Sequence, residues 1–222
     1  MSKRTLWVSI ESITLIENGD VPGQRPPTDP RNAVVATLTY PRSGAPTVSS
    51  GQPYNIPQNS SYRPNQADFF VSGLFKEVVQ DQTILEIKVT DTDKASKAEK
   101  IFFTVLGTLV SAGLTAATGG LTGFLGAISG IGVTQIYTGM GKLGQDQVYV
   151  MGATGKIPID VDAISGNKED PTVQTYPLTV PADVEKGYLV LGPDNQTQTK
   201  YLKVPKGTKN GSITLRLYAL PD

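Results

Sequence analysis

Short stretches in which apolar and polar residues alternate recur along most of the chain. Leu6, Val8 and Ile10 alternate with polar neighbours, and the alternation resumes at residues 13–15 after a predicted bend. This period of two is typical of strands with one buried face. Further strands are predicted at 33–40, 69–71, 84–89, 148–151, 156–161, 175–180, 188–191, 200–204 and 212–218. Turn-rich segments such as 18–30 separate them, so the pattern predicts a mainly β protein, an antiparallel sandwich of about eight strands.

One long segment breaks this alternation. Residues 101–141 contain no charged residue, lie between Lys100 and Lys142, and consist largely of Gly, Ala, Ser, Thr and Leu. Gly119-Gly120 divides the segment into two halves, each long enough for a helix of about 25 Å. Each half, 101–117 or 121–137, is slightly shorter than the ~20 residues that a transmembrane helix needs. The paired glycines favour two helices joined by a turn. The sequence therefore predicts an apolar α-helical hairpin, over residues 95–145, inserted in the sandwich.

Three interpretations of this hairpin remain open. It could enter a membrane, pack against other copies or another subunit, or lie in the protein's own core. Small residues spaced four apart, as at Gly107, Ser111 and Thr115, would let helix backbones approach closely in any of these settings. The side chains expected to contact a membrane or partner are the large apolar ones: Phe102, Phe103, Leu106, Leu109, Leu114, Leu121, Phe124, Leu125 and Ile128.

Composition narrows the classes of function. The length of 222 residues suits one domain over 1–222. Lys and Arg number 20 and Asp and Glu number 20, so no basic field favours nucleic acid. The absence of Cys and His removes thiol chemistry and the commonest general base, and no other spacing points to catalysis, so the protein is not expected to be an enzyme. The N-terminus lacks the pattern of a secretory signal, which favours a cytoplasmic location, peripheral to a membrane if the hairpin contacts lipid.

Two loop motifs add a family resemblance. Thr28-Asp29-Pro30 ends a loop between two strands, and the stretch LEIKVTDTDKASKAE at 85–99 carries Asp-x-Asp with an acidic residue six positions after the second Asp. These stretches resemble the first and third calcium loops of C2 domains, and residues 155–166 and 200–217 resemble later strands of that family. The resemblance covers most of the chain outside 41–66 and 101–147. It implies an eight-stranded sandwich that binds calcium and phospholipid.

The acidic residues of these loops also suit calcium on chemical grounds. Ca²⁺ takes six to eight oxygen ligands and needs neither His nor Cys. Lys94 and Lys97, however, place positive charge nearby, and Glu99 stands where the family has Asp. The alternative is that the two aspartates of the second loop merely cap a turn and a helix start. The candidate ligands are Asp20 and Asp29 in one loop, more widely separated than in the family, and Asp91, Asp93 and Glu99 in the other.

Two functional hypotheses follow. The first is a non-enzymatic membrane-interacting module: the sandwich docks at lipid, with or without calcium, and the hairpin inserts or oligomerises, with a pore as one outcome. The second is a structural or assembly protein whose hairpin packs against other subunits in a soluble particle, since a large apolar surface marks an interface. Both imply a homo-oligomer.

Overall fold

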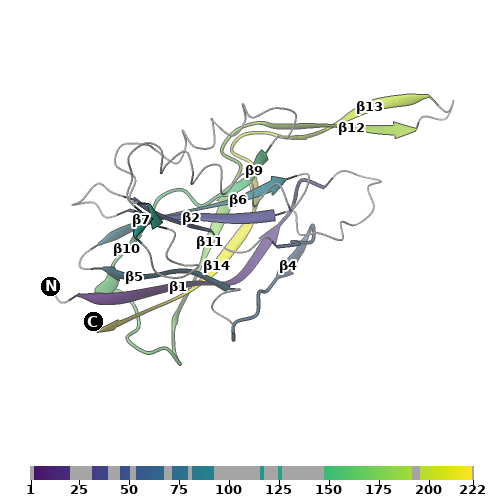
Figure 1. Cartoon of the computed structure of the whole chain (residues 1–222). Coiled ribbons are helices and arrows are strands. Elements are labelled where there is room, and N and C mark those ends of the chain that lie inside the picture. Colours follow the sequence, from purple (N-terminus) through teal and green to yellow (C-terminus); the bar gives the residue numbers. More distant parts are fainter. Residues whose placement is uncertain are drawn as a thin grey trace.

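The computed structural model describes residues 3–20, 32–39, 46–50, 54–67, 72–79, 82–92, 116–117, 125–126, 148–191 and 196–221 (Figure 1). The described residues form strands and one short 3-10 turn, so the prediction of a mainly β protein is confirmed. The elements are β1 (Arg4–Leu15), β2 (Asn32–Thr39), β3 (Pro46–Ser50), β4 (Ser60–Tyr62), β5 (Gly73–Val79), β6 (Thr83–Thr92), β7 (Ala116–Ala117), β8 (Leu125–Gly126), β9 (Val148–Ala153), β10 (Ile157–Ile159), η1 (Val161–Ala163), β11 (Thr172–Thr179), β12 (Val184–Leu191), β13 (Thr197–Val204) and β14 (Lys209–Pro221). The strand predicted at 69–71 lies outside the described residues.

Ten strands form one curled antiparallel sheet, which we call the body. The strand order is β3-β2-β6-β9-β11-β14-β1-β4, with β10 also pairing with β6 and β5 with β1. Most of the buried apolar residues that the structure describes in these strands pack into one hydrophobic core. This architecture is compatible with a β-sandwich.

The longest strand pair, β1 with β14, sets the length of the body. Arg4 lies opposite Pro221 at one end, and Leu15 lies opposite Gly211 at the other. The register shifts between Ile10 and Ser12. Such a bulge turns the following side chains back toward the core, which explains the predicted bend.

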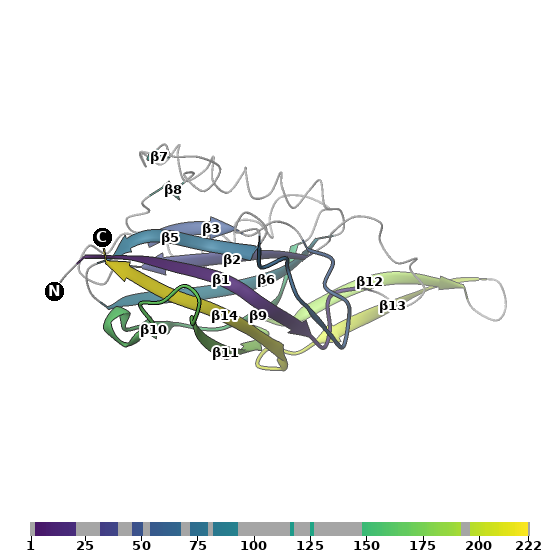
Figure 2. The ribbon, with the colours of Figure 1, turned by 90° about the horizontal axis from the view of Figure 1, so that it is seen from below.

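Strands β12 and β13 form a separate two-stranded sheet, which projects from one end of the body (Figure 2). We call this pair the arm. The sequence predicted strands at both positions but gave no sign that they leave the main sheet.

The predicted helical hairpin is wrong. Ala116–Ala117 was expected in its first helix and Leu125–Gly126 in its second, yet these residues form strands β7 and β8 and pair antiparallel. Glycine and β-branched residues, frequent in this segment, have low helix propensity. Gly119-Gly120, where a turn was predicted, lies outside the described residues. Among the described residues, no helix is long and apolar enough to cross a membrane.

Eight of the nine residues expected to contact a membrane or partner lie outside the described residues. The exception is Leu125, which lies in β8. The eight are Phe102, Phe103, Leu106, Leu109, Leu114, Leu121, Phe124 and Ile128.

Candidate functional site

Several segments meet at the end of the body from which the arm projects. Asn32, at the start of β2, pairs with Asp91 near the end of β6. Thr92 pairs with Val148, so the long segment 93–147 leaves and re-enters the body at neighbouring positions. The first loop with predicted calcium ligands therefore ends, and the second begins, at the same end of the sheet.

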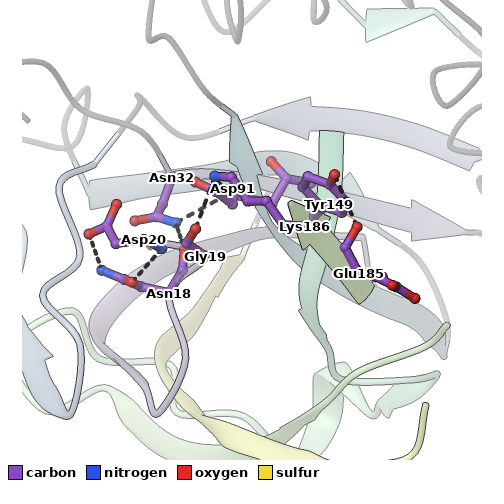
Figure 3. A network of polar contacts seen from close by, with 9 residues as sticks. Asn18, Gly19, Asp20, Asn32, Asp91, Tyr149, Glu185 and Lys186 are labelled. Carbon is purple, nitrogen blue, oxygen red and sulfur yellow. Dashed lines mark hydrogen bonds and ion pairs between the residues drawn. The ribbon is translucent and has the colours of Figure 1, made fainter. Parts of the chain in front are cut away.

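A buried ion pair joins the arm to this end. Nζ of Lys186, in β12, lies 3.0 Å from Oδ2 of Asp91, in β6, and the two side chains are only 7% and 1% exposed (Figure 3). The same ammonium donates a hydrogen bond of 3.0 Å to the carbonyl oxygen of Gly19. Removing two charges from water costs several kcal/mol per ion, which good geometry and further hydrogen bonds must offset. These contacts therefore hold the base of the arm in one position on the body.

The backbone conformation and the close packing at position 19 require a glycine. Its φ is +94°, a conformation that side-chain-bearing residues rarely adopt, and a Cβ there would lie 2.3 Å from Oδ2 of Asp91. Glycine thus lets the loop carbonyl approach the ion pair closely enough to accept a hydrogen bond from Lys186.

Two buried asparagines hold the loop around Gly19. The Asn18 side chain donates to the Ile56 carbonyl at 2.9 Å and to the Asp20 carboxylate at 2.8 Å. Its amide oxygen accepts from the Asp20 backbone N–H at 3.0 Å. Asn32 donates to the Asn18 carbonyl at 3.0 Å and accepts from the Ile56 N–H at 3.3 Å. The loop after β1 is therefore tied to β2 and to the segment around Ile56.

The base of the arm also has its own small apolar cluster. Val184 and Val204, which pair across the arm, pack with Met151 and Val180 of the body. The Tyr149 hydroxyl donates to the Glu185 carbonyl at 3.4 Å. Both apolar packing and the ion pair thus fix the base of the arm.

The distal arm presents apolar side chains to water. Leu189 is 71% exposed, Leu191 is 70% exposed and Tyr201 is 54% exposed. Because side chains alternate along a strand and Gly187 lies opposite Tyr201, these three share one face. We call the set Gly187, Leu189, Leu191, Thr197, Thr199 and Tyr201 the outer face of the arm. It carries no charge.

The structure describes two of the five predicted calcium ligands. The Asp20 carboxylate accepts one hydrogen bond from the Asn18 side-chain amide, and Asp91, which lies within strand β6, has Lys186 as its counter-ion. Asp29, Asp93 and Glu99 lie outside the described residues. Within the described ranges, no group of three or more acidic side chains could hold a metal ion. The five-residue ligand set therefore stays a prediction, in which calcium would share Asp91 with a lysine.

Sequence reasoning missed Lys186 and the arm. The sequence did contain a signal: Val184, Lys186, Tyr188 and Val190 occupy alternate positions, so in a strand they would share one face on which Lys186 is the one charged residue. A lysine on an otherwise apolar strand face indicates a buried partner of opposite charge. The partner itself could not be found, because Asp91 is 95 residues away.

The ionisable side chains at this end of the body have a mainly structural role. Lys186 and Asp91 neutralise each other. Burial raises the pKa of Tyr54 above its ordinary value, with the neighbouring Tyr62 adding to the rise, and burial also raises the pKa of Tyr62. Both phenols therefore stay protonated and uncharged at neutral pH.

Comparison with known proteins assigns no family to the chain. No protein-family model matches it, and no curated protein matches it either. The resemblance to C2 domains thus rests on short motifs, three of whose acidic residues lie outside the described ranges.

Proposed function

We propose that the protein is a non-enzymatic assembly module that binds further copies of itself through the arm. One observation carries this proposal: the outer face exposes Leu189, Leu191 and Tyr201 on an arm whose base is locked to the body by Lys186 and Asp91. A rigid apolar strip that projects into water has little use within a single copy.

The energetics favour a partner. Full burial of a leucine side chain contributes about 1.5–3 kcal/mol, and both outer-face leucines retain most of that potential. A lone two-stranded hairpin is marginally stable in water, so a partner would stabilise the arm as well. Exposed apolar patches of this kind typically mark interaction sites.

The open strand edges of the arm and the net charge of the chain also favour self-association. Among the described strands, β12 and β13 pair only with each other, which leaves each with an open edge that can accept another strand. Positive and negative residues balance at 20 each, and a net charge near zero favours association between copies.

Molar mass as a function of concentration tests the proposal. The native chain should form oligomers in sedimentation equilibrium, and Leu189→Ser/Leu191→Ser should weaken association by about tenfold or more. The matched control is Ile16→Ser, which removes a side chain that is 45% exposed at the same end but outside the arm. It should assemble like the native chain. A native chain that stays monomeric at every concentration would refute self-assembly through the arm.

The second candidate is a C2-like module that docks at a phospholipid surface. Its support is that residues 93–147, which contain the charge-free stretch 101–141, connect to the body next to Asp91 of β6 and at the same end as the loop that carries Asp20. Binding to phosphatidylserine vesicles, with and without calcium, tests this function. Leu121→Arg should weaken binding, because a charge in the bilayer costs at least ~2.5 kcal/mol. Calcium should also raise the melting temperature if the predicted ligands bind it.

A further inference from the structure

We infer that the arm of one copy docks on the opposite end of the body of the next, so that identical copies join head to tail. The receiving surface consists of residues 160–170 and the first half of β11. This inference rests on the proposed function of the arm and adds where on the second copy the arm binds.

The arm end of the molecule carries exposed positive charge. Residues 197–209, which comprise β13 and the turn into β14, contain no acidic residue. Lys203 forms an ion pair of 3.2 Å with Glu185 across the arm. Its neighbours Lys200, Lys206 and Lys209 are exposed and form no ion pair with another described residue, so their charge is available to a partner.

The receiving surface carries exposed negative charge. In residues 160–170, Lys168 is the one basic residue, and it stands among four exposed acids, Asp160, Asp162, Glu169 and Asp170. Asp162 pairs with Arg4 at 3.4 Å, and Asp160 caps η1 by accepting from the Asp162 N–H. Glu169 and Asp170 have no such structural role among the described residues.

These two charged regions lie at opposite ends of the body (Figure 2). Residues 160–170 lie beside the chain termini, since the Ala219 N–H donates to the Ser165 carbonyl at 2.9 Å. The arm starts beyond the other end of β1 and β14, where Asn210 donates to the carbonyls of Met151 and Glu17. The separation is roughly the length of β1, or about 40 Å at 3.3 Å per residue.

The receiving surface also offers apolar area and an open strand edge. Val173, which follows the acidic residues closely in sequence, is 54% exposed. β11 pairs with β14 along one side, but within the described part of the chain its other side pairs with β9 only at Thr179. Acidic, apolar and strand-edge features therefore adjoin there, as basic, apolar and strand-edge features do on the arm.

This complementarity selects a head-to-tail contact between copies. Arm against arm would bring lysines toward lysines, and like charges across an interface are disfavoured. A contact between opposite ends is heterologous, so each copy both provides an arm and receives one. Assembly then continues beyond the dimer into a ring or an open chain.

A charge exchange tests the inference. One variant is Lys200→Glu/Lys206→Glu, and the other is Glu169→Lys/Asp170→Lys. Both leave the pairs of Lys203 with Glu185 and of Arg4 with Asp162 in place. Each variant alone should associate about tenfold or more weakly than the native chain in sedimentation equilibrium. An equimolar mixture should regain native association, because each altered or native arm then meets a surface of opposite charge.

The outcomes separate the inference from the proposed function. Both variants should keep the native melting temperature, and Lys156→Glu, an exposed lysine outside both surfaces, should assemble normally. Unchanged association of either variant, or folded variants whose mixture stays dissociated, would overturn the head-to-tail contact. If Leu189→Ser/Leu191→Ser dissociates the oligomer while Glu169→Lys/Asp170→Lys does not, the arm binds elsewhere and only this inference fails. A native chain that never associates would refute the proposed function itself.

Discussion

Lys186 and Asp91 lie 95 residues apart in the sequence and form a buried ion pair across the junction of the arm with the body. The pair links β12, the first strand of the arm, to β6, a central strand of the body. An element held by buried opposite charges has one favoured position, which is the property that a docking arm needs.

Removing the lysine tests how strongly this pair holds the fold. Lys186→Met should lower the free energy of unfolding by about 3–5 kcal/mol, because Asp91 would keep its charge in a buried setting. The matched control is Lys203→Met on the same arm, whose partner Glu185 is exposed, and which should cost no more than about 1 kcal/mol. Urea unfolding measures both. Equal effects of the two substitutions would mean that the buried pair does not anchor the arm.

Alanine substitutions at two glycines with positive φ distinguish the cost of backbone strain from the cost of a steric clash. Gly211, opposite Leu15, has φ +121°, and a Cβ there would lie 1.9 Å from the Thr14 carbonyl oxygen. Gly207 has φ +83° and nothing within 4 Å of the same position. Gly207→Ala should cost about 1–2 kcal/mol from conformation alone, whereas Gly211→Ala should exceed about 3 kcal/mol. Similar losses of stability in chemical unfolding would show that β1 and β14 do not approach this closely.

Glu77 should make stability depend on pH. Burial raises the pKa of its carboxyl above the ordinary 4.5, so the folded state disfavours the ionised form. Stability from this group is fully present below the unfolded pKa and is lost as pH rises through the folded pKa. Glu77→Gln should therefore melt higher than the native chain at neutral pH, and this difference should vanish in acid. Melting curves across pH test this; a constant difference would assign the effect to something other than ionisation.

The sequence predicted most of the body because its strands follow simple alternation. Leu6, Val8 and Ile10 are fully buried as predicted, and so are Ile213 and Leu215. The position of each side chain in the alternating pattern is enough to predict its burial, since a half-buried strand requires an apolar residue at every second position. Local patterns therefore sufficed for the core.

The remaining features depend on distant residues. The segment 101–141 contains no charged residue and mixes small apolar and small polar residues, so it lacks an alternation that would separate helix from strand, and β7 and β8 were missed. The arm appeared as two ordinary strands, because alternation does not indicate whether a strand joins the main sheet. Only part of the candidate site could be predicted from the sequence. Asp91 belongs to the Asp-x-Asp motif, but its partner Lys186 lies in a strand near the other end of the chain.

Hydrogen exchange of the arm tests the central claim most directly. Backbone amides of β12 and β13 should exchange more slowly as the concentration of the native chain rises, because association would cover the outer face and its open strand edges. The Leu189→Ser/Leu191→Ser variant should show no such change. Slower exchange confined to the arm, to residues 160–170 and to the first half of β11 is the result we expect. Exchange in the arm that stays the same at every concentration, while the chain forms oligomers, would contradict an arm-mediated assembly.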